Sequence, residues 1–266
     1  ALQVPLEAVE ELRSRLDLRE ELSLLGAEVR AGVHAEEATA WGEASPVFTA
    51  KQIRVLAVLT AVTGLLAVAA VIIWIWLGTR LPMLAAVICE LLFYLRYGGA
   101  VKQIISAVER PSRDLNLLAE ILARLESEPV ASAKLVALRA KLDTEGLPPS
   151  KQIEKLNKLL EILGWMKNQF FAPVAFLLLL PAQIAVAVER WRQTTGVHIG
   201  EWLDAVAEIE ALNALANFAY ERPANPFPEI IESGACFDGE ALGHPLIAAA
   251  RCIRNDVRLD SQRQLL

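Results

Sequence analysis

The residues of this 266-residue chain that could do chemistry are few and widely separated. Cys89, Cys236 and Cys252 have neither the paired spacing of a zinc site nor the even number of a disulfide framework, which indicates a reduced, cytoplasmic setting for the polar parts. The three histidines are also far apart, so a metal cluster gets no support. No Gly-x-x-x-x-Gly-Lys-Ser/Thr motif occurs, and the chain therefore lacks the loop that cradles nucleotide phosphates and magnesium.

One ionisable group lies inside an apolar run. Glu90 interrupts the stretch from Leu81 to Leu95, which Arg96 closes. In a membrane such a carboxyl is either a helix–helix contact or a functional ionisable group. The packing or partner-facing role is favoured, because the run holds no second charge that could form a proton relay.

The element that must position this group is a long apolar segment from Val55 to Thr79, which contains no charged residue and no histidine. A helix of about 25 residues rises roughly 37 Å, enough to cross a hydrocarbon layer of about 30 Å with some tilt. Trp74 and Trp76 suit a headgroup boundary. The segment therefore predicts a membrane span, and the alternative is the central core helix of a large soluble domain.

A tight turn at Gly78–Pro82 leads into the second apolar run, which is short for a span and could be completed through Val101. Basic residues flank the outer ends of the two runs, whereas the turn carries only Arg80; these flanking residues are Lys51, Arg54, Arg96 and Lys102. By the positive-inside rule, the sequence predicts a hairpin in the inner or plasma membrane with both polar ends in the cytoplasm.

Composition agrees with a mixture of membrane-embedded and soluble helical parts. Hydrophobic residues make up 54% of the chain and the mean hydropathy is +0.36, while 22% charged residues is ordinary for a soluble domain. The net charge of −6, without a run of Lys and Arg, gives no support to nucleic-acid binding, which normally needs a basic face.

The remaining apolar stripes predict soluble helices. One amphipathic helix or helix pair is expected over 6–33, a short helix and a linker over 35–50, and further helices over 113–126, 131–142, 151–166 and 201–221, with Ser112 as the cap of the 113–126 helix. A third uncharged run, 168–188, contains Pro173 and Pro181. It is interpreted as a proline-broken helix pair, either buried in the soluble core or dipping into the bilayer surface, rather than as a third span.

The character of the chain changes near its C-terminus. Three prolines in Pro223–Pro228 require an extended segment, and short apolar pieces separated by Gly and Asp follow from Ile230 onward, which is typical of strands and turns. We therefore expect a mainly α fold with four parts: a helical region at 1–50, a transmembrane hairpin at 51–101, a helical core or lever domain at 102–228, and the first strands of a new, incomplete α/β domain at 229–266. The chain is expected to be a fragment.

The C-terminal segment resembles the start of the ATPase domain of MutS-family proteins. The resemblance rests on Gly243-His244-Pro245-Leu246, Arg254-Asn255-Asp256-Val257-Arg258-Leu259 and Gln264-Leu265-Leu266. The helical segments from Glu189 to Glu221 and the Pro226–Glu229 linker are similar to a MutS-related subgroup that carries apolar spans near its N-terminus. This resemblance implies a membrane-anchored ATPase that uses ATP and Mg²⁺ when complete and forms a homodimer through its ATPase domain.

The resemblance also implies a partial nucleotide site. Cys252 and Ile253 align with residues that pack on adenine, and Asn255 adjoins them; alternatively, Ile253 is a buried strand residue and Asn255 a turn residue. His244 is expected to be a structural turn element. Without a phosphate loop the fragment itself should not hydrolyse ATP. The rival functions are a non-enzymatic, membrane-anchored helical scaffold and a binder of mismatched DNA as in mismatch repair, the second of which the acidic charge does not support. A transporter is the least favoured.

Overall fold

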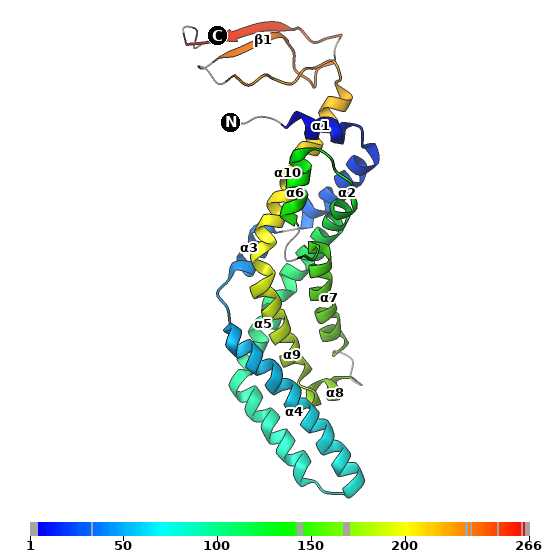
Figure 1. Ribbon diagram of the computed structural model, residues 1–266, viewed down its shortest axis with the longest axis vertical. Helices are drawn as coiled ribbons and strands as arrows, with labels where there is room; N and C mark the ends of the chain where they lie inside the picture. The colour runs from blue at the N-terminus through cyan, green and yellow to red at the C-terminus, as the bar shows by residue number, and fades with distance from the viewer. Residues whose placement is uncertain are drawn as a thin grey trace. The chain divides into compact units, whose positions relative to one another are not determined.

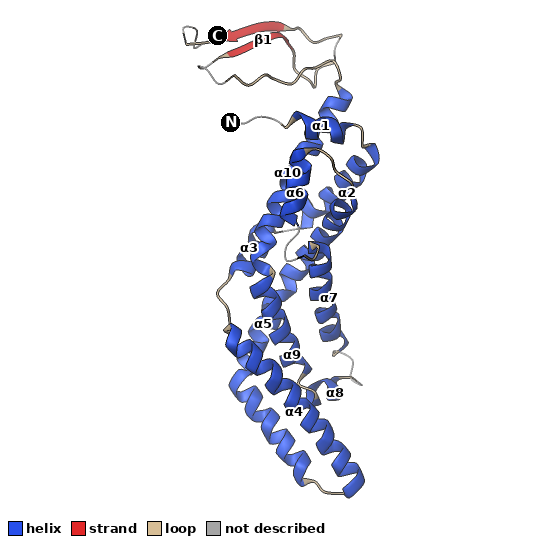
Figure 2. Ribbon diagram, in the orientation of Figure 1, coloured by secondary structure: helices blue, strands red, loops and turns tan. Residues whose placement is uncertain are grey.

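The computed structural model describes residues 5–32, 34–142, 146–166, 171–231, 234, 236–248, 250–261 and 263. Leu6–Glu221 forms one compact unit, hereafter the helical body, and the chain from Arg222 onward belongs to a second unit. Among the described residues the helical body contains only helices, and the second unit contains two strands (Figures 1 and 2). The prediction of a mainly α chain with short strands near its C-terminus is confirmed.

The helices follow the predicted segments closely. The predicted helix or helix pair at the N-terminus is a pair, and the short helix after it ends before the Pro46 linker. The α-helices are α1 (Leu6–Arg13), α2 (Leu16–Gly32), α3 (Ala35–Glu43), α4 (Ala50–Leu77), α5 (Leu81–Ser127), α6 (Ala133–Leu142), α7 (Pro149–Trp165), α8 (Ala172–Leu177), α9 (Leu180–Thr194) and α10 (Ile199–Glu221). A short 3₁₀ turn, η1 (Gly196–His198), joins α9 to α10.

The largest departure from the sequence expectation is the length of α5. The helix runs without a break from the apolar hairpin into the polar body, through Pro111 and Ser112, so the prediction that Ser112 caps a separate helix is wrong. The Ser112 hydroxyl instead donates to the Glu109 carbonyl within the helix. Proline removes one backbone hydrogen bond, but α2, α3 and α7 all pack on α5 and compensate for that loss.

The core of the helical body lies along the polar half of α5. Its apolar stripe from Val101 to Leu125 is buried against α2, α7 and α9, while α10 packs on α1 and α6. Trp202 of α10 is fully buried. These helix–helix contacts make α5 the shared axis that connects the apolar hairpin to the polar helices.

An ion-pair network fastens the N-terminal helices to the end of α5. Glu11 accepts the backbone N–H groups of Ala131 at 2.9 Å and of Ser132 at 2.7 Å, and Arg15 bridges Glu11 at 2.7 Å and Glu128 at 2.5 Å. Burial opposes ionisation of Glu11, but these N–H groups and Arg15 outweigh it and hold the pKa of this carboxyl below its ordinary value. The pKa of Glu128 is lowered in the same way, because Arg124 and Arg15 outweigh the effect of burial.

This network makes the stability of the helical body sensitive to acid. A carboxyl whose pKa is lower in the folded than in the unfolded chain stabilises the fold above its unfolded pKa, and that contribution is lost as the pH falls through the folded value. We expect Glu128→Gln to lower the unfolding free energy by about 1 to 3 kcal/mol at neutral pH. Thermal unfolding followed by circular dichroism should show a smaller loss of stability on acidification in the variant than in the parent chain. An equal loss would contradict this assignment.

The second unit contains an antiparallel pair of strands, β1 (Phe237–Leu242) and β2 (Asn255–Leu259). Phe237 pairs with Leu259 and Leu242 with Asn255, with an irregular register between Gly239 and Leu242. Both strands lie after Ile230, in the part of the chain for which the sequence predicts strands and turns. Of the predicted segments, residue 33, residues 168–170 and Gln264-Leu265-Leu266 lie outside the described residues.

Candidate membrane-inserting site

The surface of the α4–α5 hairpin is apolar and exposed. The two helices are long and apolar enough to cross a membrane, yet only 33% of the most apolar stretch of α4 and 11% of that of α5 are buried. The exposed side chains include Leu65, Leu66, Ile75, Trp76 and Leu81. A core helix of a soluble domain would be largely buried, whereas water-exposed apolar patches of this extent are rare on soluble monomers.

Local sequence signals define both ends of α4. Thr49 and Gln52 form a capping box, in which the Thr49 side chain accepts the Gln52 N–H and the Gln52 side chain accepts the Thr49 N–H. Gly78 ends the helix in a left-handed conformation (φ 70°) that glycine adopts without strain, and its N–H donates to the Trp74 carbonyl. Pro82 then lies in the first turn of α5, so the reversal between the helices is tight.

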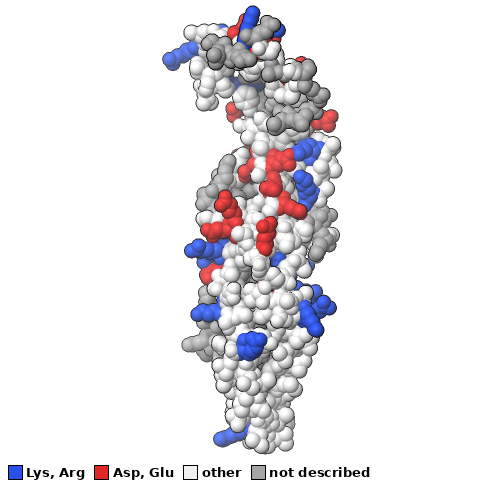
Figure 3. Space-filling model, turned by 90° about the vertical axis from the view of Figure 1, so that its left-hand side faces the viewer, with Lys and Arg blue, Asp and Glu red and all other residues white. Residues whose placement is uncertain are grey.

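Charge is distributed along the hairpin as a membrane would require. In the space-filling view the free end of the helical body is almost entirely white, with a basic group at its extremity, and further basic groups gather where the white surface ends (Figure 3). In the sequence, Lys51 and Arg54 lie at one outer end and Arg96 and Lys102 toward the other, with Arg80 in the turn. Because α4 and α5 are joined by that turn, both flanking basic pairs lie at the same end of the hairpin.

Glu90 and Tyr94 lie one helical turn apart on α5. Within the described part of the chain, Oε1 of Glu90 and the hydroxyl of Tyr94 are buried without a hydrogen-bond partner. The Tyr94 ring lies 6.4 Å from the Phe176 ring of α8. This face of α5 is therefore turned toward other helices, which favours the packing role over the functional role for Glu90.

A close approach of backbones joins α4 to the break between α8 and α9. A Cβ atom added at Gly64 would lie 2.9 Å from the Leu178 carbonyl oxygen and 3.2 Å from its Cα. Leu179, which follows, is fully buried and has a positive φ of 51°. Only glycine on α4 allows the chain to reverse this close to the hairpin.

We expect Gly64→Ala to destabilise the helical body by about 1 to 3 kcal/mol, because the added methyl group meets backbone atoms that cannot rotate away. Gly99→Ala is the matched control, since a Cβ at Gly99 of α5 meets nothing within 4 Å. Thermal unfolding in detergent micelles compares the two variants. Equal unfolding temperatures would show that α4 and Leu178 are not in contact.

A buried ion pair ties the linker before α4 to α9. Arg192 and Glu189 are 5% and 1% exposed and contact each other at 2.8 Å. The Arg192 guanidinium also donates to the Trp41 carbonyl in the last turn of α3 at 3.2 Å and to two carbonyls of the linker, those of Ala44 at 2.5 Å and Ser45 at 3.2 Å.

The other partners in this cluster complete the connection. Glu189 accepts the Val47 N–H at 2.9 Å, and the Gln193 amide donates to the Phe48 carbonyl at 2.6 Å. Trp41 stacks on Trp191 with ring centroids 6.0 Å apart. The whole linker that enters α4 is thus held by one turn of α9. No sequence pattern predicts this cluster, because its two halves are far apart in the chain.

Of the three residues predicted to form part of a nucleotide site, Cys252 and Ile253 precede β2 and Asn255 is its first residue. Ile253 is 84% exposed, so the alternative that it is a buried strand residue is wrong. Cys252 is half-buried. Asn255 pairs with Leu242 in the sheet, so the alternative that Asn255 is a turn residue is wrong as well. Nearby, the His244 ring accepts the Leu246 N–H at 3.2 Å and its carbonyl accepts the Ile247 N–H, as expected for a turn element. The nucleotide role of these residues stays a prediction.

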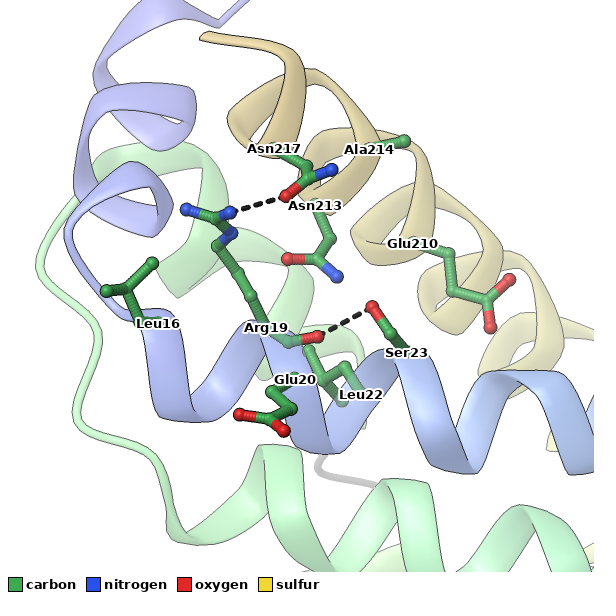
Figure 4. Close-up of a pocket in the computed structure, with 9 residues that line it drawn as sticks. All are labelled: Leu16, Arg19, Glu20, Leu22, Ser23, Glu210, Asn213, Ala214 and Asn217. Carbon is green, nitrogen blue, oxygen red and sulfur yellow. Dashed lines mark hydrogen bonds between the residues drawn. The ribbon is translucent and has the colours of Figure 1, made fainter. Parts of the chain in front are cut away.

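A separate pocket of about 500 Å³ lies between α2 and α10 (Figure 4). Its Arg19 side chain donates to Asn217 at 2.6 Å and to the Arg13 carbonyl at 2.8 Å, and the guanidinium lies 4.8 Å from the Tyr220 ring centroid. These contacts join α1, α2 and α10. The two terminal nitrogens of the guanidinium make these hydrogen bonds, whereas Nε of Arg19 is buried without a hydrogen-bond partner in the part of the chain that the structure describes. The contacts that Arg19 does make hold helices together.

Known proteins do not identify the chain. No family model matches it, and neither the curated proteins nor the solved structures include a match. Among the described residues, no group of three or more His, Cys, Asp or Glu side chains could hold a metal ion. Functional inference therefore rests on the hairpin, the helices that carry it and the sequence resemblance.

Proposed function

We propose that this chain is the membrane-anchored helical part of a MutS-like ATPase, in which the α4–α5 hairpin spans the inner or plasma membrane and both polar ends lie in the cytoplasm. The observation that carries the anchor is the exposure of the hairpin: its apolar side chains point outward from the helical body and have no protein to cover them among the described residues. Lipid is the environment in which such a surface is stable.

The arrangement of α5 supports a lever-like role for the helical body. One uninterrupted helix runs from the turn of the hairpin to Ser127, and Glu189 and Arg192 fix the start of α4 to α9. A displacement at the polar end of α5 would be transmitted to the hairpin through these rigid contacts. In our proposal, ATP binding and hydrolysis in a dimeric head supply that displacement.

The ATPase part of the proposal rests on the sequence resemblance, with the strands at the expected place as support. When bound, ATP supplies the phosphoanhydride bond whose hydrolysis drives the conformational change. The exposed Ile253 and the neighbouring Asn255 fit contact with a planar base, while the triphosphate and Mg²⁺ require a phosphate loop. The acidic net charge gives no support to DNA binding, so DNA is not included among the proposed partners.

The test adds ATP to the full-length protein. We expect it to hydrolyse ATP in lipid vesicles, and we expect alanine in place of the phosphate-loop lysine to abolish turnover while the protein stays membrane-bound. A membrane-bound protein without turnover would instead support the scaffold. A salt-dependent mobility shift with heteroduplex DNA would support the DNA-binding alternative.

A further inference from the structure

We propose that α8 and the first turns of α9 form a third membrane-embedded element, which enters the hydrocarbon layer beside the hairpin and turns back without crossing. The partner surface is the acyl region of the bilayer. This inference rests on the proposed membrane anchoring and extends it from two helices to three chain segments. It assigns a membrane role to the third uncharged run of the sequence.

The first support is where α8 contacts the hairpin. Leu178 packs against Gly64 of α4, and the Phe176 ring lies 6.4 Å from that of Tyr94 of α5. Gly64 lies near the middle of α4, and Tyr94 lies at the end of the apolar run of α5, two residues before Arg96. Figure 1 shows α8 beside α4, between the turn that joins α4 to α5 and the polar helices of the body.

The second support is depth. About 14 residues of helix separate Gly64 from the Gly78 turn, a rise of roughly 21 Å, and about 13 residues separate Leu81 from Tyr94, a rise of roughly 20 Å. A hydrocarbon layer is about 30 Å thick. If the turn of the hairpin reaches the far interface, the two contacts with α8 lie about 10 Å inside the near interface.

The third support is the chemistry of the segment. Residues 171–188 contain no charged residue and no histidine. Val174 and Phe176 are 47% and 54% exposed, so apolar side chains point away from the protein. The only long polar side chain, Gln183, donates to the Leu178 carbonyl at 2.6 Å. In a hydrocarbon environment, the polar groups at a helix break must be hydrogen-bonded within the protein, and this bond pairs the Gln183 amide with a backbone carbonyl.

The fourth support is the position of the first charged residue that follows the uncharged segment. On α9 the first charged residue is Glu189, about ten residues and roughly 15 Å beyond Leu179. Glu189 accepts the Val47 N–H and so lies level with the linker that precedes Lys51 and Arg54. By this comparison, α8 lies closer to the turn of the hairpin than the level of Lys51 and Arg54 does.

Two ionisable residues of α5 lie within about one helical turn of Tyr94, namely Glu90, discussed above, and Arg96. The Arg96 guanidinium lies 5.0 Å from the centroid of the Tyr97 ring, and the side chain is exposed. A long arginine side chain near an interface keeps its charged group in the headgroup layer while its stem lies in the apolar layer. Arg96 is therefore compatible with an embedded α8.

Depth measurement by spin labelling tests this inference. The native cysteines Cys89, Cys236 and Cys252 are replaced by serine, and single cysteines are introduced in separate variants as Val174→Cys and Phe176→Cys. Two reference variants are Leu66→Cys, 63% exposed on the hairpin, and Val136→Cys, 46% exposed on α6. Each nitroxide-labelled protein is reconstituted into phosphatidylcholine–phosphatidylglycerol vesicles, and collision rates with oxygen and with a water-soluble nickel complex are measured.

We expect labels at 174 and 176 to resemble the Leu66 reference, with access to the nickel complex several-fold lower than at the Val136 reference. Labels at 174 and 176 as accessible as that at Val136, with the Leu66 label protected, would overturn the embedded α8 and leave the anchor intact. Nickel access at Leu66 itself would overturn the membrane anchor and this inference together. Because all four sites are exposed side chains, the variants test depth rather than folding.

Discussion

Replacing Arg192 by alanine is expected to lower the unfolding free energy of the helical body by about 3 to 5 kcal/mol, because it leaves the buried Glu189 carboxylate without its positively charged partner. The substitution also removes the donor to the Trp41, Ala44 and Ser45 carbonyls, so the linker before α4 loses its attachment to α9. For a body of this size we expect a decrease of about 10 °C in the unfolding temperature, measured by circular dichroism in detergent micelles.

Arg190→Ala is the control for this substitution, since Arg190 lies on the same helix and its side chain is exposed. Surface arginines of this kind contribute little to stability, and the control should stay within about 0.5 kcal/mol of the parent chain. Equal effects of the two substitutions would show that the Glu189–Arg192 cluster does not hold the linker.

The second large effect concerns the hairpin surface. Leu66 and Ile73 are 63% and 36% exposed and lie on the same side of α4. An arginine near the centre of a membrane helix costs about 2.5 to 3.5 kcal/mol of insertion free energy. The double variant Leu66→Arg with Ile73→Arg is therefore expected in the supernatant after alkaline extraction, whereas the parent chain stays in the membrane pellet.

Two controls separate insertion from folding. Leu66→Ala with Ile73→Ala removes the same side chains without adding charge and should remain in the membrane. Val136→Arg with Leu215→Arg places the same charges on exposed positions of α6 and α10 and should also remain. Full membrane retention of the Leu66→Arg, Ile73→Arg variant would mean that this face of α4 does not meet lipid.

The helices could be predicted because their signals are local. The uncharged run of α4, the Gly78 turn and the apolar stripes of α7 and α10 each lie within one segment, and periodicity alone locates them. The extended segment after α10 and the strand pattern beyond Ile230 are equally local, which is why β1 and β2 occur where they were expected.

What could not be predicted depends on contacts between distant segments. Ser112 predicts the start of a separate helix, but packing of three helices on α5 keeps that helix continuous through Pro111 and Ser112. The Glu189–Arg192 cluster and the approach of Leu178 to Gly64 join residues that are far apart in sequence and leave no pattern in either segment. The nucleotide role of Cys252, Ile253 and Asn255 was predicted from a sequence resemblance alone. The structure adds that the Ile253 side chain is exposed.

The most direct measurement of the transmembrane hairpin uses one chain with two cysteines, Thr79→Cys in the turn and Val136→Cys on α6, in a background without native cysteines. The protein is reconstituted into sealed vesicles, treated with a membrane-impermeant maleimide and weighed intact by mass spectrometry. If the hairpin spans the bilayer, the two sites lie on opposite sides, and every chain carries one adduct in either orientation and two after detergent is added. Chains with two adducts and chains with none before detergent would place both sites on the same side and contradict the transmembrane hairpin.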